Sequence, residues 1–334
     1  MADRRTVIDT FLCRAGWGAA ARAPIVGDAS FRRYERLRAD AGTAVLMDAP
    51  PPDQDVRPFL RVGQLLADWG YSVPEVLSSD SAAGLLLLED FGERRFAEDL
   101  DAGMDPETLY GSAVDLLADL HRHPPPAALP DYSLDMMLEE VERVLDWYLP
   151  ARTGHTVKAA ARADYRQAWT AVLQPLIGRT KTVTLLDYHV ENLIWLPGRT
   201  GHRRVGLLDF QDARIGPPEH DLASLLGDVR RDVDQALAQS MLRRYMDRRM
   251  ATVDAGDCEM VFHLTGAQRN ARLVGQFVRL WKRDDKPRYL TLMPRTWRML
   301  EMDLSHPHLS PIARWFDEHI PPEDRTTPLP GVLV

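Results

Sequence analysis

The chain has 334 residues, of which 45% are hydrophobic and 27% are charged, a composition typical of an ordinary globular protein with a buried core. A formal net charge of -8 argues against nucleic-acid binding, and two distant cysteines exclude a disulfide framework. No apolar run approaches the about 18 residues of a membrane span, and charges interrupt the N-terminal apolar positions, which predicts no signal peptide. We expect roughly two domains in a cytoplasmic monomer with no nucleic-acid or membrane partner.

The first third of the chain begins with a short predicted helix and a turn of small residues. Apolar side chains recur at helical spacing between residues 7 and 12 and predict the helix. The turn, which precedes a predicted strand, consists of Gly27, Asp28, Ala29 and Ser30. Glycine and small residues let a backbone approach a ligand closely, so Ser30 and the neighbouring amides could bind phosphate oxygens. A tight hairpin would give the same pattern.

A second strand, a helix and a hairpin complete this region. The strand covers residues 43–50 and contains no lysine, because the first lysine of the chain is Lys158. Residues 55–70 have apolar side chains at helical spacing and end at a glycine, which predicts a helix. Residues 74–92 are typical of a hairpin, and the uninterrupted apolar run 85–88 predicts that its second strand lies inside the sheet.

The middle of the chain is predicted to be helical. Helical patterns cover residues 106–121, 134–149 and 155–177, and the proline-rich segment 123–130 forms a loop after the first of them. His121, at the end of the first helix, is expected to pack inside the protein rather than to act as a catalyst.

Two acidic turns then follow short apolar runs. Asp187 ends the first run and is followed five residues later by Asn192, while Asp209 ends the second run. Phosphoryl transfer needs a carboxylate that orients the attacking hydroxyl and accepts its proton, together with oxygen ligands for Mg²⁺. Asp187 fits the first role, and Asn192 and Asp209 fit the second, with Asp212 as an alternative ligand. Turn chemistry alone can also place Asp and Asn in such hairpins.

The C-terminal part is predicted to be helical over residues 232–302. Asp221 precedes this part at the start of an apolar helix, where the simplest interpretation is an N-cap. The segment 268–284 is polar and aromatic at once, so it could line a substrate cleft or form a partly solvated helix face. The candidate substrate residues in this segment are Gln268, Arg269 and Gln276.

The first acidic turn resembles the catalytic loop of the aminoglycoside phosphotransferases, which are relatives of the protein kinases. Their motif is His-Gly-Asp-x-His-x-x-Asn; residues 187–192 match it, and Leu185 stands where the first His is expected. The resemblance implies an α+β, two-lobe, protein-kinase-like fold, with ATP and Mg²⁺ between the lobes. A small antiparallel sheet with one packed helix would form the nucleotide-binding lobe, residues 1–92, and a larger helical lobe, residues 93–334, would carry catalysis and substrate binding. In that family an aspartate matching Asp221 also braces the catalytic loop.

The same resemblance implies the nucleotide contacts. The segment Leu-Leu-Glu-Asp-Phe-Gly is similar to the family's hinge, whose backbone near the Glu binds adenine, and it puts the lobe boundary near Gly92. Protein kinases carry a lysine on the second strand, and here an arginine is expected to replace it at the phosphates. The alternative for those arginines is a solvated strand face. The implied nucleotide-binding residues are Gly27, Asp28, Ala29, Ser30, Arg32, Arg33, Glu89 and Phe91.

Several segments together resemble the bacterial cell-wall amino sugar kinases of this family. They are residues 27–34, the lysine-free segment 45–51, residues 187–193, residues 208–213, and residues 283–284 with 286–290. The resemblance implies ATP-dependent phosphorylation of the anomeric hydroxyl of N-acetylmuramate and N-acetylglucosamine in peptidoglycan recycling. Alternatives are an aminoglycoside or choline-like kinase and a nucleotide-binding pseudokinase scaffold, which would not need all of Asp187, Asn192 and Asp209. The expected substrate residues are His189, Glu191, Gln268, Arg269 and Gln276.

Overall fold

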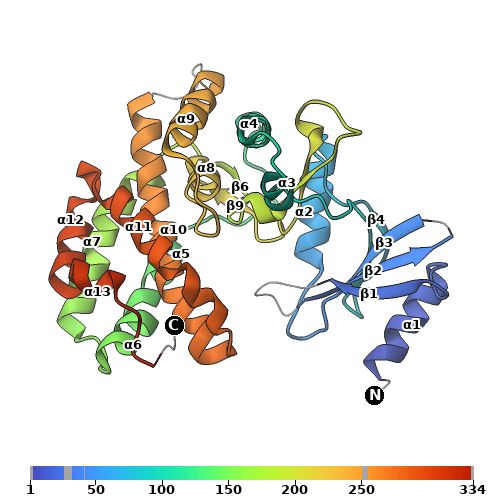
Figure 1. Cartoon of the computed structure of the whole chain (residues 1–334), viewed down its shortest axis with the longest axis horizontal. Helices are drawn as coiled ribbons and strands as arrows, with labels where there is room; N and C mark the ends of the chain where they lie inside the picture. The colour runs from blue at the N-terminus through green and yellow to red at the C-terminus, as the bar shows by residue number, and fades with distance from the viewer. Residues whose placement is uncertain (1–2, 26–31, 41, 250–254, 332–334) are drawn as a thin grey trace. The chain divides into compact units, whose positions relative to one another are not determined.

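A computed structural model describes most of the chain (Figure 1). The described residues are 3–25, 32–40, 42–249 and 255–331. The predicted phosphate-binding turn of Gly27, Asp28, Ala29 and Ser30 therefore lies outside the described residues. Within these ranges no helix combines the length and the hydropathy that crossing a membrane would require.

The chain divides into two compact units that alternate along the sequence. The first unit comprises Met1–Ser112 and Val190–Asp212, and the second comprises Ala113–His189 and Ala213–Val334. The lobe boundary predicted near Gly92 stays a prediction. The first acidic turn spans both units, because the chain passes from the second unit to the first directly after His189. The second acidic turn, at Asp209, lies within the first unit.

The first unit is built on a five-stranded antiparallel sheet. In spatial order the strands are β1 (Ala21–Ile25), β2 (Arg33–Ala39), β3 (Gly42–Asp48), β5 (Leu85–Glu89) and β4 (Val76–Asp80). The apolar strand β5 lies between β3 and β4 and its first four residues are buried, which confirms its predicted interior position. Helix α1 (Arg4–Arg14) adds Ile8, Phe11 and Leu12 to a core cluster formed with β2, β3 and β5.

Three more helices belong wholly or partly to the first unit. They are α2 (Arg57–Asp68), α3 (Phe96–Asp101) and α4 (Pro106–Leu120), of which α4 continues into the second unit. The ring centroids of Phe59 on α2 and Phe210, next to Asp209, lie 4.8 Å apart. The sequence predicted one helix packed on the sheet, over residues 55–70, whereas α1 also contributes to the core of the sheet.

Two short antiparallel strand pairs carry the acidic turns. They are β7 (Leu193–Trp195) with β8 (Val205–Leu207) in the first unit, and β6 (Thr182–Thr184) with β9 (Arg214–Gly216) in the second. Asp187 follows β6, and Asp209 follows β8. Each predicted acidic residue therefore lies just beyond the end of a buried strand, as the apolar runs in the sequence indicate.

The rest of the second unit is mainly helical. Among the described residues its helices are α5 (Leu134–Val141), the π-helical η1 (Val144–Tyr148), α6 (Leu149–Thr153), α7 (Ala159–Ile177), α8 (Glu219–Leu226), α9 (Gln235–Arg249), α10 (Ala255–Asp284), the 3₁₀ helix η4 (Pro287–Leu292), α11 (Met293–Leu304), the 3₁₀ helix η5 (Pro307–Leu309), α12 (Ser310–His319) and α13 (Pro322–Thr326). The long helix α10 packs against α5, η1, α8, α11 and η4. Small antiparallel sheets and this larger helical part confirm the predicted α+β class.

A glycine of α10 allows a close approach to the segment that the sequence predicted as one continuous helix. A Cβ at Gly275 would lie 2.2 Å from the carbonyl carbon of Arg143, so only glycine leaves room for this backbone. Arg143 directly precedes η1, where the helix that was predicted over residues 134–149 changes to π geometry. The absence of a side chain at Gly275 thus determines where Arg143 packs along α10.

Candidate active site

The predicted catalytic turn, residues 185–187, leaves β6 in a strained backbone conformation. Leu185 and Leu186 are buried, and Leu186 has a φ of 71°, in the left-handed region that residues with a side chain seldom adopt. The next residue, Asp187, has 40% of its side chain exposed. The turn therefore presents a carboxylate at the surface of the second unit while its two leucines stay in the core.

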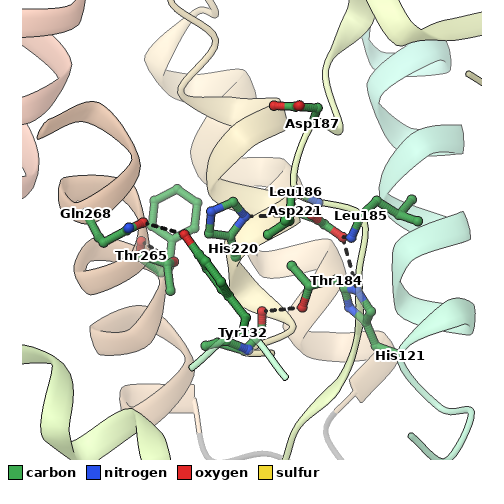
Figure 2. A network of polar contacts seen from close by, with 12 residues as sticks. His121, Tyr132, Thr184, Leu185, Leu186, Asp187, His220, Asp221, Thr265 and Gln268 are labelled. Carbon is green, nitrogen blue, oxygen red and sulfur yellow. Dashed lines mark hydrogen bonds and ion pairs between the residues drawn. The ribbon is translucent and has the colours of Figure 1, made fainter. Parts of the chain in front are cut away.

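Asp221 of α8 holds this turn from inside the protein (Figure 2). Its carboxylate accepts hydrogen bonds from the amides of Leu185, at 2.6 Å, and Leu186, at 2.9 Å. Burial acts to raise the pKa of Asp221, but its interactions with His121 and His220 outweigh burial and keep the pKa below its ordinary value. A buried, charged acceptor thus satisfies two buried amides, which explains how the strained turn persists.

The expected N-cap role of Asp221 is wrong, and the bracing role that the family resemblance implied is confirmed. Helix α8 begins at Glu219 with Pro218 at the N-cap position, so Asp221 already lies within the first turn. An aspartate near a helix start gives the same local pattern whether its side chain bonds its own helix or a distant strand end. The contact with Leu185 and Leu186 could not be distinguished from a cap by sequence spacing.

His121 packs against Asp221, as predicted for a residue at the end of α4. Its imidazole is buried; Nδ1 lies 2.7 Å from the Tyr245 hydroxyl, and Nε2 lies 3.9 Å from the Asp221 carboxylate. Burial lowers the pKa of His121, so the ring is neutral near pH 7. This environment supports a packing role for His121.

A second polar network reaches Asp187 from α10, through a residue that the sequence analysis did not select. Arg272 places one guanidinium nitrogen 3.6 Å from Asp187 and another 3.7 Å from Glu140 of α5, and only 13% of its side chain is exposed. Burial opposes the charge of Arg272, but Glu140 and Asp187 more than compensate and raise its pKa. Arg272 is therefore a permanent cation that links the catalytic turn to a buried acid.

Glu140 is held by the side chains around it. The Tyr132 hydroxyl donates to Glu140 at 2.5 Å, and the Gln268 amide donates at 3.1 Å. Burial acts to raise the pKa of Glu140, but Arg272 and Tyr132 outweigh it, so the pKa lies below the ordinary value. Burial and Glu140 together raise the pKa of Tyr132 well above its usual value. An ionised Glu140 thus fixes Arg272 behind Asp187.

The predicted substrate residues of α10 differ in their surroundings. Gln268 is buried in the network of Tyr132 and Glu140, and Figure 2 shows its amide directed at the Tyr132 hydroxyl. Arg269 is buried and donates to the carbonyl of Gly227 at 3.3 Å, and burial lowers its pKa to about 10. Gln276 is partly buried, and no described residue hydrogen-bonds its side-chain oxygen. Their roles as sugar ligands stay predictions.

The two remaining substrate candidates lie in the catalytic loop on either side of the unit boundary. His189, the last residue of its segment in the second unit, is buried. Glu191, in the first unit, lies 3.6 Å from a guanidinium nitrogen of Arg95 and has 36% of its side chain exposed. A sugar-binding role for these two residues also stays a prediction.

In the first unit, the strand register brings the two predicted metal ligands to one end of the β7–β8 pair. The amide of Leu208 donates to the carbonyl of Asn192 at 2.9 Å, and Asp209 follows with a φ of 53°. Gln211 donates to both Asp209, at 2.9 Å, and Asp212, at 3.0 Å. Among the described residues there is no cluster of three acidic, histidine or cysteine side chains that could hold a metal alone. One carboxylate and one amide oxygen do fit Mg²⁺ that also binds substrate phosphates.

The two arginines that could replace the missing lysine have different surroundings. Arg32 has a guanidinium nitrogen 3.7 Å from Asp209, and only 12% of its side chain is exposed. Arg33, the first residue of β2, is exposed. Arg32 therefore lies beside a predicted metal ligand, whereas Arg33 has the solvated position expected of an ordinary strand face.

The predicted adenine hinge follows β5 and is fixed by residues of the same unit. Glu89 accepts a hydrogen bond from Arg199 at 2.7 Å, and the same guanidinium lies 5.1 Å from the centre of the Phe91 ring. The backbone amide of Glu89 donates to the carbonyl of Glu75 at 2.8 Å. The sequence analysis missed Arg36 of β2, which donates to Asp90 at 2.8 Å and ties the hinge to the sheet.

The spacing of polar residues in α10 contains a pattern that indicates Arg272. In α10, residues 268, 272, 276 and 279 recur at intervals of four and three and are all polar, so they lie on one face of the helix. A polar face within a helix that is otherwise largely buried indicates a special environment. Nothing in the local sequence, however, indicates that Glu140 would lie opposite this face.

Comparison with known proteins identifies the family. A model of the phosphotransferase enzyme family matches residues 22–256 of the chain. The chain belongs to that phosphotransferase family. The N-acetylmuramate/N-acetylglucosamine kinase of Caulobacter vibrioides is 34% identical over 97% of this phosphotransferase and 98% of its own length. The protein of the same name from Pseudomonas aeruginosa is 32% identical over 86% of this chain and 85% of its own.

Solved structures of distant relatives share the fold. Aminoglycoside phosphotransferase APH(2'')-Ib, solved with ADP bound, is 14% identical with a TM-score of 0.60, covering 89% of this phosphotransferase and 96% of its own chain. Choline kinase LicA of Streptococcus pneumoniae is 13% identical with a TM-score of 0.66, covering 90% and 99%. These similarities confirm the predicted kinase-like fold.

Replacing Asp221 by alanine is expected to destabilise this phosphotransferase by roughly 2 to 5 kcal/mol, because two buried amides would lose their acceptor. Urea unfolding measures the change. Since the folded pKa of Asp221 is lowered, its stabilisation is present at neutral pH and is lost as the pH falls below about 4. Asp131→Ala, which removes a carboxylate that is 62% exposed, serves as the control and should change stability by less than about 1 kcal/mol. Equal effects of the two substitutions would contradict the bracing role.

Proposed function

We propose that the chain is a cytoplasmic, monomeric kinase that transfers the γ-phosphoryl group of ATP to the anomeric hydroxyl of N-acetylmuramate and N-acetylglucosamine in peptidoglycan recycling. The observation that carries the proposal is the partly exposed Asp187 carboxylate on a turn that Asp221 and Arg272 hold from two sides. Similarity over nearly the whole length of a kinase with these named substrates supports the choice of acceptor. The ADP-bound structure of a relative with this fold supports the choice of phosphoryl donor.

Asp187 is the proposed catalytic residue. Its carboxylate accepts a hydrogen bond from the anomeric hydroxyl, aims the oxygen at the γ-phosphorus and takes the proton as the bond between that phosphorus and ADP breaks. An anomeric hydroxyl is more acidic than an ordinary alcohol, so it demands less of the base and more of correct positioning. Arg272, 3.6 Å away, restrains the Asp187 side chain and is itself held by Glu140.

Residues of the first unit are proposed to bind the nucleotide and its metal. Asn192 and Asp209 would hold Mg²⁺, which would supply positive charge to neutralise the phosphates of the nucleotide. Arg32, next to Asp209, is the favoured replacement for the missing lysine, because a guanidinium can bind phosphate through two hydrogen bonds. The other proposed nucleotide contacts are Gly27, Asp28, Ala29, Ser30, and the hinge residues Glu89 and Phe91.

Asp187→Asn is expected to lower turnover on the order of a hundred- to ten-thousand-fold, because the amide cannot accept the hydroxyl proton. Binding of nucleotide, measured by calorimetry, should change little. Asp146→Asn is the control, since this carboxylate lies in the same unit, is 49% exposed and pairs with Arg162 at 2.6 Å. Near-normal turnover of Asp187→Asn would refute the role of Asp187 as the base.

Asp209→Ala is expected to abolish turnover and to weaken Mg²⁺-dependent nucleotide binding, because one of two proposed protein ligands is lost. Asp212→Ala tests the competing carboxylate, which shares the Gln211 amide with Asp209. Titration of each variant with Mg²⁺ at fixed ATP compares the two. An inactive Asp212→Ala beside an active Asp209→Ala would assign the ligand to Asp212 instead.

The acceptor is tested with a panel of hydroxyl compounds and MgATP, with the position of the product phosphate determined by NMR. We expect N-acetylmuramate and N-acetylglucosamine to give 1-phosphates. Aminoglycosides and choline serve as the comparison acceptors. Phosphorylation at the 6-hydroxyl, or turnover of the comparison acceptors alone, would overturn the proposed substrate and leave the phosphotransferase assignment in place.

A further inference from the structure

Arginine side chains gather on one face of α10 next to the catalytic carboxylate. Arg272 and Arg279 are seven residues apart, so they lie on the same face of the helix, with Gln276 between them. Arg143 reaches this face from the neighbouring segment, because a Cβ at Gly275 would lie 2.6 Å from the Cβ of Arg143. The arginine cluster, defined as Arg143, Arg272 and Arg279, thus extends along α10 from the contact with Asp187.

The cluster has more positive charge than its surroundings neutralise. Arg272 lies within 4 Å of Asp187 and Glu140, whereas in the described part of the chain neither Arg143 nor Arg279 makes a side-chain hydrogen bond or an ion pair. Burial lowers the pKa of Arg143, and repulsion from Arg272 and Arg279 lowers it further, against the attraction of Glu140. The two carboxylates facing three guanidinium groups therefore leave one positive charge in excess.

The end of the cluster at Arg279 is also short of negative charge. Burial and the nearby Arg283 lower the pKa of Arg279, while Asp284 acts in the opposite direction. Asp284, however, accepts two hydrogen bonds from Arg283, at 2.7 and 2.8 Å. A partly buried cation without an ion-pair partner is unfavourable unless a ligand or water compensates its charge.

Two buried hydrogen-bonding atoms in the same place are suited to a polar ligand. The side-chain oxygen of Gln276 and the Nε of Arg272 are buried, and no described residue hydrogen-bonds either atom. Buried polar atoms in proteins are normally satisfied by protein, water or ligand. One acceptor and one donor therefore accompany the surplus positive charge within a few helical turns of Asp187.

We propose that Arg143 and Arg279 bind the carboxylate of an acidic acceptor sugar, with Gln276 binding a hydroxyl or amide of the same molecule. This inference rests on the proposed function and names the residues that distinguish its two acceptors. N-acetylmuramate has a lactyl ether with a carboxylate, which N-acetylglucosamine lacks. A guanidinium can bind a carboxylate through two hydrogen bonds, so the charged sugar gains an interaction that the neutral sugar does not.

The anion could also belong to the nucleotide, because phosphates and carboxylates share the same guanidinium chemistry. Arg143 and Arg279 lie in the unit that contains the proposed base, and the proposed phosphate and metal ligands lie in the other unit. This distribution favours the acceptor. Michaelis constants for ATP and for each sugar distinguish the two sources.

The test compares Arg143→Gln and Arg279→Gln with the unmodified full-length enzyme in steady-state assays on both sugars. Each substitution should raise the KM for N-acetylmuramate by roughly ten- to a hundredfold, the range expected when a hydrogen bond to a charged group is lost. The KM values for N-acetylglucosamine and ATP should change by less than about threefold, within the context-dependence of a neutral contact. Arg143→Lys and Arg279→Lys should recover part of the preference for the charged sugar.

Arg298→Gln on α11 is the matched control, because it removes a partly exposed arginine that pairs with Asp232. It should leave the ratio of the two sugar specificities unchanged. Equal loss on both sugars would show a structural role for the cluster, and a selective rise in the KM for ATP would assign it to phosphate. Either result overturns the inference, while the proposed function stands. An unmodified enzyme that turns over neither sugar refutes the proposed function and, with it, this assignment.

Discussion

The paired hydrogen bonds from the Leu185 and Leu186 amides to Asp221 are the constraint on which the site depends. Leu186 has a left-handed backbone conformation, which costs a residue with a side chain on the order of 1 to 2 kcal/mol. A buried carboxylate with two amide donors can offset that cost. The chain passes through the second acidic cluster before α8 returns to hold the first, so the catalytic turn is complete only when both segments are folded.

Helix α10 contributes both to the packing of the second unit and to the surroundings of Asp187. The same helix packs against α5, η1, α8 and α11 and carries Gln268 and Arg272 on its polar face. Tyr132, Glu140 and Gln268 satisfy one another inside the unit, which leaves Arg272 as the member that reaches Asp187. The position of the Asp187 carboxylate, the proposed base, therefore depends on packing between helices that are distant in sequence.

Sequence patterns predicted the elements near the reacting groups better than the contacts between them. Short, mainly apolar segments located the strands before Asp187 and Asp209, although the buried strand β6 itself has the sequence Thr-Val-Thr. The pairing of Glu140 with Arg272 could not be predicted, since nothing in the local sequence places Glu140 opposite the polar face of α10 and only the packing of α5 on α10 brings the two residues together. The role of Asp221 was obscured for a related reason, because a local capping pattern and a long-range contact use the same residue type.

Gly275 has a consequence for the proposed carboxylate site. The backbone of Arg143 lies against the bare Cα of this glycine, so the place of the Arg143 guanidinium is determined by main-chain packing as well as by its own side-chain rotamer. Residue 275 would therefore influence the proposed carboxylate site without touching its ligand. A side chain at this position would force the backbone of Arg143 away from α10 and so displace one of the proposed ligand groups while leaving every proposed contact residue unchanged.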